Sequence, residues 1–284
     1  MFSFSMRFRV FILSALLPFC GVASLYDFNI NVTFGSGMDE SYKSAFSNAA
    51  SFWESQITGY RIDNAALHGI TISANVAARD GVGGILSSAG PTQGYFLRHV
   101  QLAGDSLSSD VLYATAGAIT FDSADVDDLI SRGFWDQVIL HEMAHVIGFG
   151  TLWGFNYAGT IYNNFYVAGS GQYTGAAGLA AYREEFDPNA SYVPVELDGG
   201  AGTANGHWDE TYGGADITGI TDANGNDMAN ALMTGWLNTP TFVSKTTVAQ
   251  FYDLGYTVIP EPTPLSMIAL VSAGALWLRR RLYC

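Results

Sequence analysis

Val138-Ile-Leu-His-Glu-Met-Ala-His-Val-Ile-Gly-Phe-Gly150 is the most informative stretch of this sequence. Apolar side chains recur in it every four positions, at Ile139, Met143 and Ile147. This spacing predicts a helix, and because the segment is apolar nearly all round we expect the helix to be buried. His141 and His145 are four residues apart, so they lie on nearly the same helix face and can reach one metal ion.

Glu142 directly follows the first histidine and completes the pattern His-Glu-x-x-His, which is typical of zinc-dependent hydrolases. Neutral imidazole nitrogen is a good Zn²⁺ ligand, and a carboxylate beside the metal can take a proton from its bound water. The pattern fixes only three positions, so it also arises by chance on ordinary solvated helices. The apolar flanks argue against that alternative, because burying these polar groups without a role would be costly.

The composition predicts a globular body that follows a processing segment. The chain has 284 residues, of which 49% are hydrophobic and 13% charged, enough for one or two domains. Residues 1–23 carry Arg7 and Arg9, then an apolar run, then Gly21-Val22-Ala23. This order predicts a secretory signal peptide that is cleaved after Ala23.

The C-terminal end combines Pro260-Glu261-Pro262, an apolar stretch from Leu265 to Leu278, and Arg279-Arg280-Arg281. As a helix this stretch would rise about 21 Å, short for a bilayer core of about 30 Å, so a simple anchor is one interpretation. The three-part order also resembles the PEP-CTERM sorting signal of Gram-negative bacteria. That resemblance implies a sorting and transmembrane tail over 260–284, an exosortase-type processing enzyme, and delivery to the cell envelope or extracellular matrix.

The body between these ends is strongly acidic. The whole chain has a formal net charge of −14, yet five of its 12 basic residues lie in the two ends and only one acidic residue does. We therefore expect no binding to nucleic acid or anionic lipid surfaces. Cys20 and Cys284 both lie in the ends, so no disulfide is expected in residues 24–259.

Hydrophobic periodicity predicts a mixed sheet with helices against it. Predicted strands cover residues 26–34, 70–76, 85–86 and 113–121, and predicted helices cover 39–57, a short segment that starts in 122–128, the His141 region and 175–185. The acidic residues at 122–128 could bind Ca²⁺, although helix capping is a simpler explanation. Asp222–Asp227 has part of a calcium-loop pattern, but it lacks the glycine and glutamate that complete one, which favours a tight turn.

A catalytic zinc needs three protein ligands and one open position, so the sequence must supply a third ligand. His68 and His99 precede the helix in polar or strand-like sequence, which is typical of surface or packing histidines. His207 lies in a glycine-rich segment, residues 199–210, and Trp208 follows it. We therefore predict that His207 is the third ligand.

Three pieces of the sequence are informative as an ordered set: His141–Trp153, His207-Trp208 and Leu232-Met233-Thr234-Gly235. Together they resemble the leishmanolysin family of metzincin metalloproteases. Members of this family place the third zinc histidine after an insertion, and here 61 residues separate His145 from His207. The resemblance implies that Met233 forms a Met turn beneath the zinc without ligating it. Better-known members carry many disulfides and a cysteine-bearing propeptide, and this body has no cysteine.

The predicted fold class is therefore α+β, a metzincin-like zinc protease with a mixed sheet and helices in an upper lobe and a loop-rich lower lobe. The catalytic domain is predicted over 24–259, with the upper lobe at about 24–150 and the lower lobe at about 151–259.

The predicted function is a secreted or envelope-anchored zinc endopeptidase that acts on proteins or peptides. His141, His145 and His207 hold one Zn²⁺, and Glu142 is the general base. One alternative is a non-catalytic exopolysaccharide-matrix protein that uses a protease-like fold for binding, and another is a zinc hydrolase with a substrate other than peptide.

Overall fold

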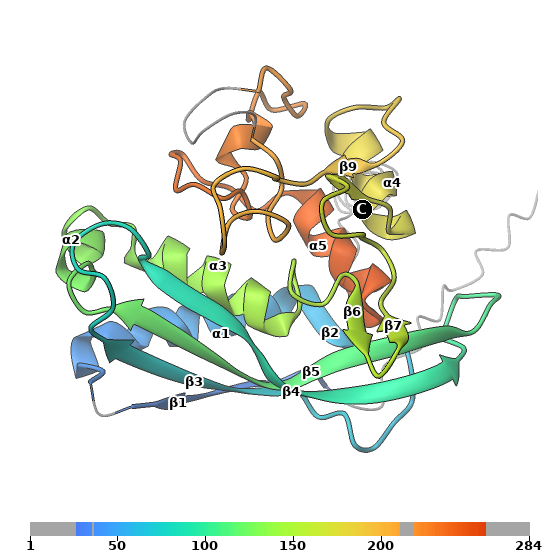
Figure 1. The fold of residues 1–284 in the computed structure, drawn as a ribbon, viewed down its shortest axis with the longest axis horizontal. Helices are drawn as coiled ribbons and strands as arrows, with labels where there is room; N and C mark the ends of the chain where they lie inside the picture. Colours follow the sequence, from blue (N-terminus) through green and yellow to red (C-terminus); the bar gives the residue numbers. More distant parts are fainter. Residues whose placement is uncertain (1–26, 36, 211–217, 260–284) are drawn as a thin grey trace, which may run out of the picture.

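A four-stranded sheet lies at the bottom of the molecule in Figure 1, and two helices, α1 and α3, lie on its upper face. The computed structural model describes residues 27–35, 37–210 and 218–259. The strand order is β1-β3-β5-β4, with β1, β3 and β5 parallel and β4 antiparallel at one edge. The four strands are β1 (Ile30–Phe34), β3 (Ile70–Ala77), β5 (Ser109–Asp122) and β4 (Ser87–Val100).

The sheet presents its apolar side chains to the two helices. Side chains alternate across a strand, and Ile70, Ile72 and Ala74 of β3 are buried on one face. In the next strand, Gly117 lies opposite Ile72. A Cβ atom on Gly117 would lie 2.3 Å from Cγ1 of Val146, so the glycine allows α3 to pack close to the sheet.

The helices above the sheet are α1 (Lys43–Gln56), which follows the 3₁₀ turn η1 (Glu40–Tyr42), and α3 (Trp135–Ile147). Helix α1 buries Phe46, Ala49 and Trp53. The indole nitrogen of Trp53 donates a hydrogen bond of 3.0 Å to the carbonyl of Leu140 on α3. This contact joins α1 to α3, and both helices contact the sheet. The short helix α2 (Val126–Ser131) precedes α3 in the chain.

The end of the described chain returns to its beginning. Strand β2 (Ile57–Tyr60) pairs antiparallel with β10 (Tyr256–Val258). Their tyrosines join an aromatic cluster in which the ring of Tyr113 meets those of Tyr60 and Tyr256. Tyr256 also donates a hydrogen bond of 3.0 Å to the carbonyl of Ile147, so this cluster supports the last turn of α3.

The chain after α3 forms short elements and loops, most of which lie above α3 in Figure 1, with β6 and β7 to its right. The elements are β6 (Phe155–Tyr157), β7 (Thr160–Tyr162), β8 (Gln172–Tyr173), α4 (Ala176–Glu185), β9 (Val193–Pro194), η2 (Met228–Asn230) and α5 (Lys245–Asp253). Stacked indoles hold this region together, because the rings of Trp153 and Trp208 lie 4.9 Å apart and both are buried.

The structure confirms an α+β fold and most of the predicted elements. Helices were expected at 39–57, around His141 and at 175–185, and they correspond to η1 with α1, to α3 and to α4. The strand prediction for 85–86 is wrong, because these residues precede β4. Asp122 ends β5, so the short helix starts only at Val126.

The predicted signal peptide, residues 1–23, and the predicted sorting tail, residues 260–284, lie outside the described residues. In the described part of the chain, no helix has both the length and the hydrophobicity needed to span a bilayer.

Candidate metal centre

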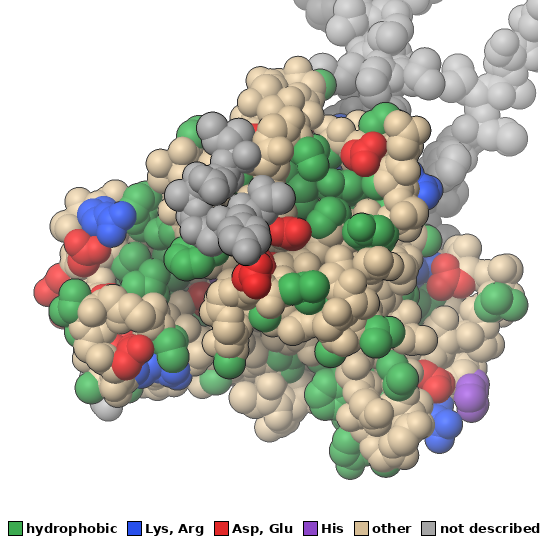
Figure 2. All heavy atoms as spheres, turned by 45° about the horizontal axis from the view of Figure 1, so that its top comes forward, with side chains coloured by type: hydrophobic (Ala, Val, Ile, Leu, Met, Phe, Trp, Pro, Cys, Tyr) green, Lys and Arg blue, Asp and Glu red, His purple; other side chains and the backbone are tan. Residues whose placement is uncertain are grey.

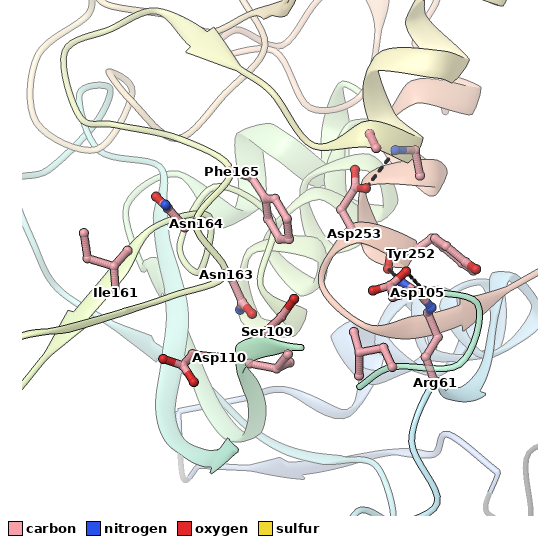
Figure 3. A pocket seen from close by; sticks show the side chains of 14 residues that line it. Arg61, Asp105, Ser109, Asp110, Ile161, Asn163, Asn164, Phe165, Tyr252 and Asp253 are labelled. Carbon is pink, nitrogen blue, oxygen red and sulfur yellow. Dashed lines mark hydrogen bonds and ion pairs between the residues drawn. The ribbon is translucent and has the colours of Figure 1, made fainter. Parts of the chain in front are cut away.

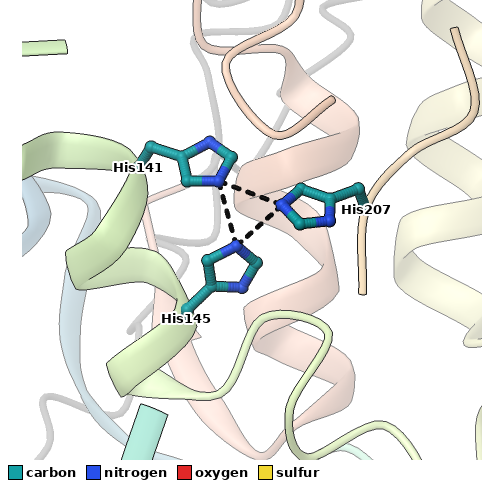
Figure 4. A group of neighbouring side chains, drawn as sticks. All are labelled: His141, His145 and His207. Carbon is teal, nitrogen blue, oxygen red and sulfur yellow. Dashed lines mark hydrogen bonds between the residues drawn. The ribbon is translucent and has the colours of Figure 1, made fainter. Parts of the chain in front are cut away.

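Helix α3 carries two of the three histidines that meet above it. His141 and His145 lie one turn apart on the helix, and both rings point toward His207 (Figure 4). The helix ends at Gly148, whose φ of 136° is a left-handed conformation that favours glycine. The chain therefore turns away from the helix soon after the second histidine.

His207 reaches the same place from a loop. Its backbone carbonyl accepts a hydrogen bond of 3.0 Å from the Glu196 amide, and the next amide, of Trp208, donates one of 2.9 Å to the carbonyl of Met233. Trp208 is fully buried. The loop is therefore fixed on both sides of His207 although it has little regular secondary structure.

The three imidazoles converge on one point through their Nε2 atoms (Figure 4). The Nε2–Nε2 separations are 3.0 Å between His141 and His145, 3.0 Å between His145 and His207, and 3.1 Å between His141 and His207. These separations are close to the edge of a tetrahedron of ligands around Zn²⁺, about 3.3 Å.

The other nitrogen of each ring points to a backbone carbonyl. Nδ1 of His141, His145 and His207 lies 2.6, 2.9 and 2.8 Å from the carbonyl oxygens of Leu232, Phe149 and Thr203. A carbonyl oxygen can only accept, so each Nδ1 carries the proton and each Nε2 presents a lone pair. Three lone pairs that face one another repel unless a cation lies between them.

The electrostatics of the site favour neutral rings. Burial, followed by the neighbouring imidazoles, lowers the pKa of His145 well below its usual value. Burial and then His141 lower the pKa of His207 to about 3. These rings are therefore unprotonated at neutral pH, as a metal ligand must be. Three imidazoles suit Zn²⁺ and related transition metals rather than Ca²⁺.

Glu142 lies in the same cavity as the three histidines, which has a volume of about 1010 Å³. Its side chain is only 8% exposed, and its Oε1 atom accepts a hydrogen bond of 2.6 Å from the Ser87 hydroxyl on β4. Burial is the main influence on the pKa of Glu142 and raises it, whereas His141 and Ser87 lower it. The carboxyl group is therefore shielded from water, held by Ser87 and placed in the same cavity as the three histidines.

Met233 is fully buried at the bend that follows Leu232. The two residues contact the site through their backbone, since the carbonyl of Leu232 bonds His141 and that of Met233 bonds the amide after His207. The predicted Met-turn segment thus braces two of the three histidines. Neither the carbonyl acceptors nor Ser87 was predicted, because only the folded chain brings them to the site.

Two histidines and one acidic loop of the sequence lie apart from the metal centre. His68 and His99 are exposed and lie outside the cluster, as predicted. In the described ranges, the three site histidines are the only group of three or more His, Cys, Asp or Glu side chains close enough to share an ion. The carboxylate of Asp222 accepts hydrogen bonds from the amides of Asn224 and Asn226, which forms the predicted tight turn. Binding of Ca²⁺ stays a prediction.

A second cavity, of about 370 Å³, lies between the start of β5 and helices α4 and α5 (Figure 3). Its charged groups already have partners. Arg61 pairs with Asp105 and donates to the carbonyl of Tyr252, and Asp253 accepts the amides of Ala177 and Gly178. These side chains therefore hold neighbouring segments together.

The sequence matches no protein-family model, and a search of curated proteins found no match. The relation to the leishmanolysin family and the sorting signal therefore remain predictions from the sequence.

Proposed function

We propose that this protein is a zinc-dependent endopeptidase. The observation that carries the proposal is the convergence of three unprotonated Nε2 atoms, of His141, His145 and His207, in a cavity that also contains the Glu142 carboxylate. A Zn²⁺ ion held by these nitrogens would supply Lewis-acid chemistry, polarising a carbonyl and acidifying a nearby water.

Glu142 would move the proton. Its carboxylate takes a proton from the attacking water and then gives it to the leaving amine, as one group acting first as base and then as acid. Ser87 donates to Oε1 of this carboxylate and restricts its rotation, so Oε2 is the oxygen that is left for the transfer. The surrounding walls exclude most bulk water from Glu142, which is nearly buried.

A polypeptide is the substrate that the cavity wall favours. Ser87, Ser88 and Ala89 line the cavity, and they belong to β4, the outer strand of the sheet. An outer strand has backbone amides and carbonyls without strand partners on one side, and an extended peptide can pair with them. This feature favours peptide over other hydrolysable substrates.

Incubation of the purified protein with a peptide library, with and without a chelator, tests this function. We expect cleavage that the chelator abolishes and that added Zn²⁺ restores. Absence of any cleavage by the metal-loaded protein would favour the non-catalytic alternative, a binding protein of the extracellular matrix.

Two variants assign the roles of the residues. Glu142→Ala should retain zinc and lose about 10²-fold or more in cleavage rate, because it lacks the proton acceptor. His207→Ala should lose most of its zinc during mild dialysis, because two imidazoles hold the ion less tightly. Zinc content by metal analysis checks both variants, and a His207→Ala protein with full zinc content would show that the ligand assignment is wrong.

A further inference from the structure

We propose that Arg79 forms a carboxylate-binding subsite in the wall of the cavity, so that the enzyme prefers peptides with a carboxylate close to the scissile bond. This inference rests on the proposed function, and it adds the chemical class of the preferred substrate.

Arg79 lies in the connection between β3 and β4 and lines the same cavity as the three histidines. Its guanidinium donates a hydrogen bond to the hydroxyl of Ser88. The preceding residue, Ser87, donates its own hydroxyl hydrogen to Glu142. A ligand held by Arg79 would therefore lie near the reacting groups.

The charge of Arg79 is not neutralised by the protein. Within the described residues, no carboxylate lies within ion-pair distance of it, whereas Arg61 and Arg132 are paired with Asp105 and Asp128. Among the described side chains that line the cavity, Arg79 is the sole Lys or Arg. Figure 2 shows that basic side chains are few and scattered on the face it displays.

The loop that carries Arg79 is held rigidly by two buried aspartates at the end of β5. Asp122 accepts hydrogen bonds from the amides of Asp80 and Gly81, at 3.0 and 2.9 Å. Asp125 accepts one of 2.7 Å from the amide of Gly83. Arg79 therefore starts from a fixed backbone, which reduces the entropy that a bound ligand must overcome.

A carboxylate is the group that matches an unpaired arginine at a cavity wall. The planar guanidinium offers two parallel N–H groups to the two oxygens of a carboxylate, and Arg79 is exposed and can orient toward a ligand. In a peptide this carboxylate comes either from an Asp or Glu side chain or from the free C-terminus. Peptides that differ only in these groups distinguish the two sources.

The experiment compares kcat/KM for matched peptides. A cleaved peptide is prepared with Glu or Gln at each position in turn, and with a free or amidated C-terminus. We expect one Glu position, or the free terminus, to raise kcat/KM about tenfold over its neutral match, and Arg79→Gln to reduce this ratio to near one. Arg79→Glu should favour Lys at the same position.

Arg132→Gln is the matched control, because it removes an exposed arginine that does not line the cavity, and it should keep the preference of the wild type. Equal cleavage of all matched peptides by the wild type would overturn the subsite and leave the proposed function intact. If no peptide is cleaved, the proposed function fails, and calorimetric binding of the same peptides still decides the subsite. Equal Kd values for acidic and neutral peptides would then overturn it.

Discussion

Backbone carbonyls determine the chemical state of the three histidines. The acceptors, on Leu232, Phe149 and Thr203, come from three separate segments. The His-Glu-x-x-His pattern supplies two imidazoles, but their lone pairs face a common point only because these carbonyls fix the proton on Nδ1. The ability of the three histidines to share one ion therefore depends on the fold as much as on the motif.

Ser87→Ala should weaken catalysis without removing metal. The hydroxyl of Ser87 donates to Glu142 and lowers its pKa, so its loss allows the pKa to rise further. A general base must be deprotonated, and therefore the acidic limb of the activity profile should move to higher pH. We expect about a tenfold loss of kcat/KM at pH 6 and a smaller loss at pH 8, because one charge-assisted hydrogen bond is removed. Ser87→Thr keeps a hydroxyl and should restore the profile, whereas an unshifted limb in Ser87→Ala would contradict this role.

Glu210 makes the stability of the protein depend on pH. Burial, together with the nearby Glu196, raises the pKa of Glu210 to about 7, whereas an ordinary glutamate has 4.5. The folded state therefore binds more protons than the unfolded state between these values, and stability falls as the pH rises from about 4.5 to about 7.

Glu210→Gln should remove this dependence, because the amide resembles the protonated acid and does not ionise. At pH 8 we expect its Tm to exceed that of the wild type by about 2–4 °C, which corresponds to roughly 1 kcal/mol for a domain of this size. The difference should shrink or reverse at pH 5. Glu184→Gln, at an exposed position, serves as control, and a Tm difference that is the same at both pH values would refute the assignment.

At the scale of elements, the sequence predicted those helices and strands that bury one face, because burial imposes a periodic pattern of apolar residues. Helix α3 and strand β1 were predicted because their apolar residues recur with a clear period. Strand β4 was missed because it is an edge strand with no buried residue, so nothing imposes alternation on it. Helix α5 was not predicted and has only nine residues. Ser244 was the sequence signal that could have located its start, because serine is a favoured N-cap residue and here accepts a hydrogen bond from the Thr247 amide.

The residues of the metal site also differ in how far the sequence could predict them. His141, Glu142 and His145 share one helix, so their relation could be predicted from spacing. Assigning His207 required elimination among the histidines and a resemblance. Ser87 and the carbonyl acceptors could not be predicted, because their approach to the site depends on long-range packing.

The turn after α3 sets the distance between the helix and the loop of His207. Gly150 has a φ of 69°, and a Cβ on it would lie 2.2 Å from the carbonyl oxygen of Gly206. Gly150→Ala should therefore push away the segment next to His207 and lower zinc affinity by about tenfold or more, because second-shell geometry controls metal binding.

Gly159→Ala separates backbone strain from this displacement. Gly159 has a φ of 81°, and a Cβ on it would meet nothing within 4 Å. Both variants should lose some Tm through strain, but only Gly150→Ala should lose zinc affinity in a competition titration with a chelator. Equal affinities in the two variants would show that the turn does not position His207.

At the scale of the whole molecule, the metal site connects two regions of different construction. The sheet with α1 and α3 is built from long elements whose backbone groups pair with one another. The loop of His207 contains no helix or strand and is held by turn and bridge hydrogen bonds, among them those from Glu196 to His207 and from Trp208 to Met233. A shared ion would cross-link the two regions, and its contribution to stability should therefore be local to the loop.

Metal removal should consequently loosen one part of the chain. After chelation we expect hydrogen exchange at residues 196–209 to accelerate by about 10–100-fold, because the loop then opens without breaking metal–ligand bonds. Exchange in β1, β3 and β5 should remain unchanged, since their hydrogen bonds lie within the sheet. His207→Ala should exchange rapidly at 196–209 with or without chelator, which controls for effects of the chelator itself. Uniform acceleration over the whole chain would mean that the ion supports global folding, and no acceleration would mean that the loop does not bind it.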